Sequence, residues 1–166
     1  MRKIAVSLII LILVMVWGCE KPIDIEAEKA AIKDVILAET KASVELKSFE
    51  EIAKTWGHKP YSRRVAASND GYSDYLGWDT ISAGFKRWVN ENPEPGEPKL
   101  KENFIFRVWD KGAWVMSEEY TESEKAEDPS YIPRLTFHVL EKTEEGWKII
   151  FLGQILRDSY PNADTE

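Results

Sequence analysis

Apolar and polar positions alternate most clearly near the end of the chain, where two apolar runs flank a charged break. Residues 134–141 and 147–156 are rich in β-branched and aromatic side chains, and residues 143–146, which end in Gly146, separate them. Two such runs joined by a short polar segment that contains glycine are typical of a β-hairpin. We therefore predict two long antiparallel strands, one face of which other elements must cover.

Two more hairpins are predicted earlier in the chain. Strand-like runs at residues 100–109 and 113–121 flank a three-residue turn that ends in glycine. The runs at residues 61–68 and 72–76 flank Asn69-Asp70-Gly71, a strong local turn signal. In each case the two runs are expected to pair with each other.

Three other segments have apolar residues at helical spacing. Asp24 can cap the first helix, and Ser48 with Glu51 forms a capping box at the start of the second. Asp79 is placed to cap the third. The apolar residues of this third helix recur at i, i+4, i+7 and i+8, namely Ile81, Phe85, Trp88 and Val89. Each helix is thus expected to pack one face on something flat.

The order of these elements predicts one α+β domain at residues 24–157, with helices on one face of a bent antiparallel sheet. Residues 122–130 are expected to form a polar loop, and residues 158–166 a flexible tail. A chain of 166 residues with 43% hydrophobic content and seven tryptophans can build one core of this kind.

The first 18 residues have the layout of a secretory signal peptide. Arg2 and Lys3 precede an apolar stretch at residues 4–17 that is short for a membrane-spanning helix. The stretch ends at Gly18-Cys19, which looks like the lipobox of a bacterial lipoprotein, although Trp17 departs from the small residue usual two positions before the cysteine.

This resemblance implies cleavage after residue 18 and lipidation of Cys19. Residues 19–23 would then be a lipidated tether, and the domain would lie at a membrane surface of the bacterial cell envelope, on its periplasmic or outer face. The alternative is a chance cysteine behind a signal peptide or an uncleaved anchor. Cys19 is the only cysteine, so no intramolecular disulfide forms, and an unpaired thiol in an exported protein needs another explanation.

Charge and histidine content exclude two classes of function. The net charge of −7 becomes about −9 once residues 1–18, with their two basic side chains, are removed. Such a surface repels nucleic acid backbones, so no nucleic acid partner is expected. His58 and His138 are the only histidines, and no HExxH or paired-carboxylate spacing surrounds them. Neither a metal site nor another cofactor is predicted.

Residues 24–157 resemble the nuclear transport factor 2-like superfamily, most closely its SnoaL-like domains. The resemblance rests on five pieces in this order: Glu39 near the end of the first helix, Trp56-Gly57-His58, Gly77-Trp78-Asp79-Thr80-Ile81, Arg134-Leu135-Thr136, and Gly146-Trp147-Lys148-Ile149. It implies a cone-shaped, cystatin-like fold in which three helices cover a curved antiparallel sheet. It also implies a pocket between the concave sheet face and the helices, and a homodimer through the outer sheet face.

The segments that form the pocket wall in this superfamily carry several aromatic residues. We expect Trp56, Tyr61, Trp78 and Trp88 to contact a ligand, because ligand sites are mostly apolar with a few placed polar groups. The alternative for each is burial in the core, where aromatic residues contribute large apolar areas. His58 lies near the expected pocket mouth and can act as a general base, or can simply bond to backbone.

Arg134, Thr136 and His138 alternate onto one face of their strand, and Leu135, Phe137 and Val139 take the other. If the polar face lines the concave side, Arg134 can bind an anion and His138 can titrate beside it. Otherwise Arg134 pairs with an acidic residue such as Glu39, and His138 lies on the outer face.

Three hypotheses for function follow. The first is a lipid-anchored domain whose aromatic pocket binds a small apolar or anionic ligand, or whose sheet face serves as an oligomerising interaction module. The second is a small lyase, isomerase or cyclase that uses His58 with Tyr61 or Arg134, with His138 a weaker catalytic candidate. The third is a structural partner whose pocket is filled by its own side chains. The isomerase branch of the superfamily needs a strand-borne aspartate set that this chain lacks.

Overall fold

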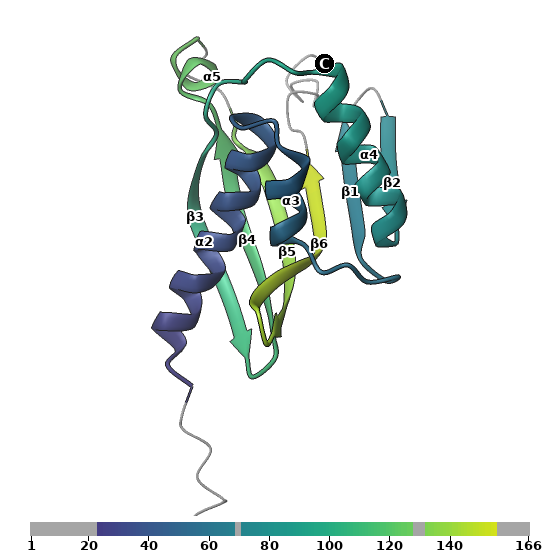
Figure 1. Cartoon of the computed structure of the whole chain (residues 1–166). Helices are drawn as coiled ribbons and strands as arrows, with labels where there is room; N and C mark the ends of the chain where they lie inside the picture. The colour runs from purple at the N-terminus through teal and green to yellow at the C-terminus, as the bar shows by residue number, and fades with distance from the viewer. Residues whose placement is uncertain (1–22, 69–70, 128–131, 156–166) are drawn as a thin grey trace, which may run out of the picture.

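The computed structural model describes residues 23–68, 71–127 and 132–155 (Figure 1). The predicted signal peptide at residues 1–18, the lipidation site Cys19 and the predicted tail at residues 158–166 lie outside these ranges. The helices are α2 (Ile25–Val44), α3 (Phe49–Thr55), α4 (Trp78–Glu91) and the short α5 (Glu122–Glu127). The strands are β1 (Arg63–Ser68), β2 (Gly71–Leu76), β3 (Leu100–Trp109), β4 (Gly112–Tyr120), β5 (Arg134–Thr143) and β6 (Gly146–Ile155).

The first two helices begin where their caps predict. The Asp24 carboxylate accepts a hydrogen bond of 3.1 Å from the backbone N–H of Ala27 and caps α2. The Ser48 hydroxyl accepts one of 3.3 Å from the backbone N–H of Glu51 and caps α3. Each side chain satisfies a backbone donor that the first turn of a helix leaves without an intrahelical partner.

The prediction that Asp79 caps α4 is wrong. The helix begins at Trp78, and its N-cap is Gly77, at φ +84° and ψ 146°. This backbone conformation is essentially restricted to glycine. A Cβ at this position would also lie 3.3 Å from the carbonyl oxygen of Pro60. Glycine is therefore required where the chain turns from β2 into α4.

All six strands form one sheet in the order β2-β1-β6-β5-β4-β3. The three predicted hairpins are confirmed, because β1 pairs with β2, β3 with β4, and β5 with β6, all antiparallel. The exception to the antiparallel pattern is the β1–β6 pair, which is parallel and joins strands far apart in the sequence. It places Arg64 beside Leu152, and so attaches the β1–β2 hairpin to the rest of the sheet.

The predicted loop at residues 122–130 begins with a helix instead. In α5 the backbone N–H of Thr121 donates to the Glu124 carboxylate at 2.8 Å, and the backbone N–H of Glu124 donates to the Thr121 hydroxyl at 3.2 Å. This reciprocal pair is a capping box. The spacing of threonine and glutamate in the sequence could have predicted it.

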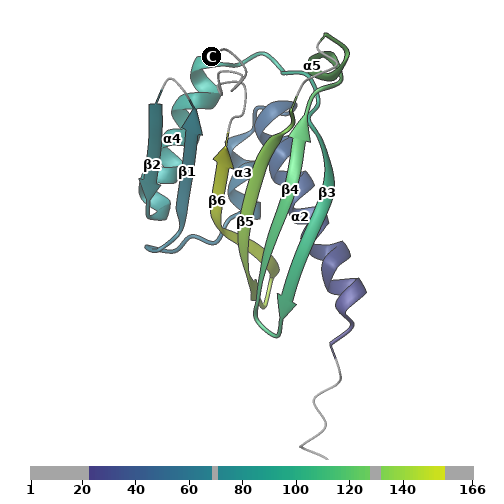
Figure 2. The same cartoon turned by 180° about the vertical axis from the view of Figure 1, so that it is seen from behind.

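The helices α2, α3 and α4 cover one face of the sheet (Figure 1), and the reverse view shows the other face without a helix across it (Figure 2). The core lies between these layers and joins apolar side chains of the three helices to those of the central strands, including Ile32, Ile36, Ile52, Phe85, Val115, Leu140, Ile149 and Leu152. No helix within the described ranges is long and apolar enough to cross a membrane. The predicted α+β class, with helices over a curved sheet, is confirmed.

Candidate functional site

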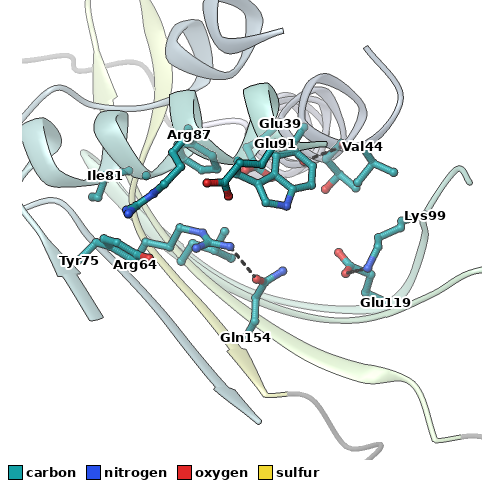
Figure 3. Close-up of a pocket in the computed structure, with 16 residues that line it drawn as sticks. Glu39, Val44, Arg64, Tyr75, Ile81, Arg87, Glu91, Lys99, Glu119 and Gln154 are labelled. Atoms are coloured by element: carbon teal, nitrogen blue, oxygen red, sulfur yellow. Dashed lines mark hydrogen bonds and ion pairs between the residues drawn. The ribbon is translucent and has the colours of Figure 1, made fainter. Parts of the chain in front are cut away.

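A cavity of about 310 Å³ lies between α2, α4 and the concave sheet face (Figure 3). Its walls come from segments distant in sequence, because the β1–β6 pairing brings the first hairpin and the helix α4 that follows it beside β6. The residues that line it are Glu39, Thr40, Ser43, Val44, Arg64, Tyr75, Ile81, Gly84, Phe85, Arg87, Trp88, Glu91, Lys99, Glu119, Leu152 and Gln154. This volume is at the small end of the range of ligand sites.

One wall of the cavity is apolar. The predicted apolar face of α4 supplies Ile81, Phe85 and Trp88, and Leu152 contributes from β6. Ile81 and Phe85 are buried, whereas Trp88 is 36% exposed. The Lys47 ammonium lies 3.7 Å from the centre of the Trp88 ring, which is cation–π geometry. The face thus combines core packing with a partly open indole at the cavity.

The sheet side of the cavity presents Arg64. Its Nη2 donates to the Gln154 side-chain oxygen at 3.4 Å, and its guanidinium lies 5.4 Å from the centre of the Phe85 ring (Figure 3). The Nε of Arg64 is buried and has no hydrogen-bond partner among the described residues. Arg64 also forms no ion pair with any described carboxylate, whereas Arg63 next to it forms one with Asp74. Arg64 is therefore an incompletely satisfied cation facing the cavity.

Glu39 of α2 lies across the cavity from the sheet (Figure 3) and is 5% exposed. Burial raises the pKa of its carboxyl, and the charges of Lys101 and Arg64 only partly oppose this. The indole N–H of Trp56 acts in the same direction as these cations, although its geometry falls outside that of a hydrogen bond. The protonated, neutral form of Glu39 is thus favoured relative to an ordinary glutamate.

A second acidic group of the cavity, Glu119, is paired with lysines. The Glu119 carboxylate lies 2.5 Å from the Lys101 ammonium and 3.1 Å from that of Lys99. Burial opposes ionisation of Glu119, but the charges and hydrogen bonds of the two lysines outweigh it and hold the pKa at about 2. Glu119 and Lys101 side chains are 3% and 1% exposed. Glu119 and Lys101 thus form a buried ion pair, with Lys99 beside it.

The polar face of β5 points towards the helices. Thr136 and His138 are both fully buried on the helix side, and Leu135, Phe137 and Val139 are half-buried on the other side. Thr136 and Ser117 share a hydrogen bond of 2.8 Å between their hydroxyls. Neither Thr136 nor His138 lines the cavity.

His138 lies in the same row across the sheet as Val115 and Leu152. Burial, reinforced by the charge of Lys101 and opposed by that of Glu119, lowers its pKa to about 3. Neither ring nitrogen has a hydrogen-bond partner among the described residues. The imidazole is therefore neutral and packed, and does not contact the cavity as an acid or base.

His58 lies outside the cavity. Its ring stacks on Trp78 at 4.0 Å between centroids and 10° between planes, and its Nε2 is 2.9 Å from the backbone oxygen of Ala53. It borders a separate, shallow hollow that also includes Lys148 and the turn at residues 143–145. This geometry matches the alternative stated above, in which His58 bonds to the backbone at the end of its helix.

The other predicted site residues take different positions. Trp88 lines the cavity, whereas Trp56 is 2% exposed and belongs to the core. Tyr61 is 53% exposed and donates to the Glu141 carboxylate, with 3.1 and 3.0 Å to its two oxygens. Arg134 forms an ion pair with Glu124 of α5, not with Glu39.

The polar residues of the cavity were not predicted as a site. Arg64 sits in a short strand with no motif around it, and Gln154 is an ordinary polar position near the end of β6. Glu39 was noted as a feature of the first helix and as a possible ion-pair partner. One feature of the sequence could have indicated the site. A charged residue at an inward-facing position of a strand or helix is rare unless its charge has a partner. Among the described residues, no group of three or more His, Cys, Asp or Glu is arranged to hold a metal ion.

Comparison with known proteins identifies the fold. No protein-family model and no curated protein matches the sequence. A protein of unknown function with a cystatin-like fold from Nostoc punctiforme PCC 73102 superposes with a TM-score of 0.60 at 15% identity, over 80% of this chain and 93% of its own. An NTF2-like protein of unknown function from Shewanella baltica OS155 gives 0.59 at 13% identity, over 80% and 96%. A presumed dehydratase of the NTF2-like family from Streptomyces avermitilis gives 0.58 at 15% identity, over 78% and 96%.

At these identities the similarity shows the fold alone, and it does so consistently. The chain has the nuclear transport factor 2-like, cystatin-like fold that its motifs predicted. These structures do not distinguish a SnoaL-like domain from other branches of the superfamily.

Proposed function

We propose that this domain binds a small organic molecule in the cavity between α2, α4 and the sheet. The observation that carries the proposal is the composition of the walls, with an apolar side from α4 and, on the sheet side, the Arg64 guanidinium, which forms no ion pair with a described carboxylate. Ligand sites commonly combine an apolar lining with a few polar groups that fix orientation. At roughly 30 Å³ per water molecule, about 310 Å³ accommodates about ten waters, or one small ligand.

The catalytic alternative, an enzyme of lyase, isomerase or cyclase type, receives less support. Its proposed base His58 stacks on Trp78, Tyr61 donates to Glu141, and Arg134 pairs with Glu124. None of these three side chains lines the cavity. The hypothesis that the pocket is filled by the protein's own side chains is weakened by the cavity itself.

The setting of this binding function belongs to the proposal as well. We place the domain among the SnoaL-like proteins on its motifs, and at the bacterial cell envelope through lipidated Cys19. The homodimer stays a prediction. It is supported by half-buried apolar side chains on the sheet face that no described helix covers, namely Trp114, Met116, Leu135, Phe137, Val139 and Phe151.

Gly84 provides a direct test of the cavity. It lines the cavity in the middle of α4, and a Cβ there would meet Tyr75 at 3.4 Å, an ordinary contact. Gly84→Ala adds one methyl group and leaves the cavity open, whereas Gly84→Leu extends a side chain into it. Both variants gain about 1 kcal/mol of helix propensity relative to glycine, so the pair is matched for its effect on α4.

The assay is a thermal-shift and calorimetric screen of apolar and anionic metabolites against the protein without residues 1–19, which retains every described helix and strand. We expect at least one compound to bind the wild-type protein and Gly84→Ala alike, and to lose at least tenfold in affinity for Gly84→Leu. Equal affinity for both variants would place the ligand elsewhere and overturn the proposal.

A further inference from the structure

The charges that face the cavity do not cancel locally. Glu119 is matched by Lys101 and Lys99, with oxygen–nitrogen distances of 2.5 and 3.1 Å. Arg64 has no such partner: its described contacts are one hydrogen bond to the uncharged Gln154 side chain and the face of Phe85. A partly buried cation without a carboxylate is unfavourable, because its lost hydration is not replaced.

Arg63 shows what Arg64 lacks. The two residues are adjacent in β1 and therefore point to opposite faces of the sheet. On the outer face the Nε and Nη2 of Arg63 bind the two oxygens of Asp74 at 2.8 and 2.5 Å, a bidentate pair. On the concave face the guanidinium of Arg64 has the same donors, and no carboxylate among residues 23–68, 71–127 and 132–155 pairs with them. A ligand with a carboxylate would supply the missing group.

The carboxyl groups near the cavity do not take that role. Glu39 lies on the helix side, where its neutral form is favoured by burial and where it makes no hydrogen bond with described residues. Glu91 lies at the exposed end of α4, next to Arg87, and reaches the cavity from its open side (Figure 3). The deepest charge that remains unpaired is therefore positive.

We propose that the ligand is an organic monocarboxylate, with its carboxylate on the Arg64 guanidinium and its apolar body against Ile81, Phe85 and Leu152. This inference rests on the proposed function, because it assigns the chemistry of the ligand that the cavity holds. The Nη2 contact with Gln154 is long, at 3.4 Å, so a carboxylate replaces it readily and can take a second donor from the amide of Gln154. A single carboxylate is favoured over two, because Arg64 offers one guanidinium and the nearby lysines Lys99 and Lys101 are already paired with Glu119.

Three probes of equal chain length but different head-group charge test whether the cavity prefers a carboxylate over a neutral or a cationic group. Octanoate, 1-octanol and octylamine share an apolar body and differ only in the head group. We expect calorimetry at pH 7 to give about tenfold to a hundredfold tighter binding for octanoate than for 1-octanol, since a hydrogen bond to a charged group contributes about 1.5–3 kcal/mol. Octylamine should bind most weakly, because its ammonium would face the uncompensated guanidinium.

Two variants locate the preference. Arg64→Gln should remove the preference of octanoate over 1-octanol while 1-octanol binding persists, which also shows that the variant is folded. Arg64→Lys keeps the charge but loses the planar fork, and should retain part of the preference. Arg63→Gln is the matched control, since Arg63 is the neighbouring arginine in β1 but lies on the outer sheet face, outside the cavity, and we expect it to keep the preference.

The outcomes distinguish the two levels of the proposal. Equal binding of octanoate and 1-octanol, tighter binding of octylamine, or an unchanged preference in Arg64→Gln would overturn the carboxylate inference and leave a binding cavity in place. No binding of any of the three probes, together with no ligand in the metabolite screen, would overturn the proposed function itself.

Discussion

The burial of His138 allows a quantitative prediction, because the contribution of a fully buried histidine to the free energy of unfolding depends on pH. In the folded protein its pKa is about 3, while an exposed histidine in the unfolded chain has a pKa of about 6.5. Between these values the unfolded chain binds a proton that the folded protein does not. Stability from this residue is therefore complete above pH 6.5 and is lost as the pH falls towards 3.

The size of the effect follows from the two pKa values. Lowering the pH from 7 to 5 protonates His138 in the unfolded chain almost completely and leaves it neutral in the folded protein, which costs about 2 kcal/mol of unfolding free energy. With a urea dependence of about 2 kcal/mol per molar for a small domain, the unfolding midpoint should fall by about 1 M from this residue alone.

Comparison with His138→Leu isolates this contribution. Leucine has a similar volume and no polar atom, so the variant should be as stable as the wild type at pH 7 or more stable, given that both imidazole nitrogens lack described partners. Burial raises the pKa of Glu39, which makes stability rise as the pH falls through that pKa, but this contribution is common to both proteins. Glu119, with a pKa of about 2, contributes a constant stability over the pH range used, and this contribution is lost only at lower pH.

The measurement is urea unfolding of both proteins at pH 7, 6 and 5, followed by tryptophan fluorescence. We expect the wild-type midpoint to fall relative to that of His138→Leu by about 1 M between pH 7 and 5. Parallel changes in the two midpoints would show that His138 titrates normally in the folded protein, and would refute its burial as a neutral group.

Three further substitutions test the contacts that hold the fold. Glu119→Gln leaves the buried Lys101 unpaired and should cost about 3–5 kcal/mol in urea unfolding; a loss below 1 kcal/mol would mean that the pair is solvated. Ser48→Ala removes the acceptor of the Glu51 backbone N–H and should cost about 1 kcal/mol, with no loss expected if water replaces the cap equally well. Gly77→Ala forces an alanine to φ +84° and should cost about 1–3 kcal/mol, whereas unchanged stability would indicate that α4 can begin one residue later.

The parts of the fold that the sequence predicts correctly depend mostly on interactions between residues close together in the chain. Asp24 and Ser48 each carry an acceptor at the right distance from a backbone donor, and that chemistry acts within four residues. Asp79 looked equally suitable, but the chain needs a positive φ two residues earlier, which Gly77 provides. The same reasoning applied to Thr121 and Glu124 would have found α5.

The site could not be predicted in the same way, because it depends on a pairing between distant strands. Arg64 becomes a cavity residue only when β1 lies beside β6, and no local pattern specifies that parallel pair. The predicted aromatic residues differ in position: Trp56 is in the core, whereas Trp88, near the end of the apolar stripe of α4, reaches the cavity. Histidines drew attention as titratable groups, yet the unpaired charge is an arginine.

The parallel contact between β1 and β6 also constrains how the chain acquires its structure. Arg64 and Leu152 are register partners although nearly 90 residues separate them, and closing such a long loop is slow compared with forming a local hairpin. During synthesis β1 must wait for the last strand to emerge before it can pair. Until then Arg64 and α4 have only the β1–β2 hairpin beside them, and the wall that β6 contributes is missing, so the cavity is completed last.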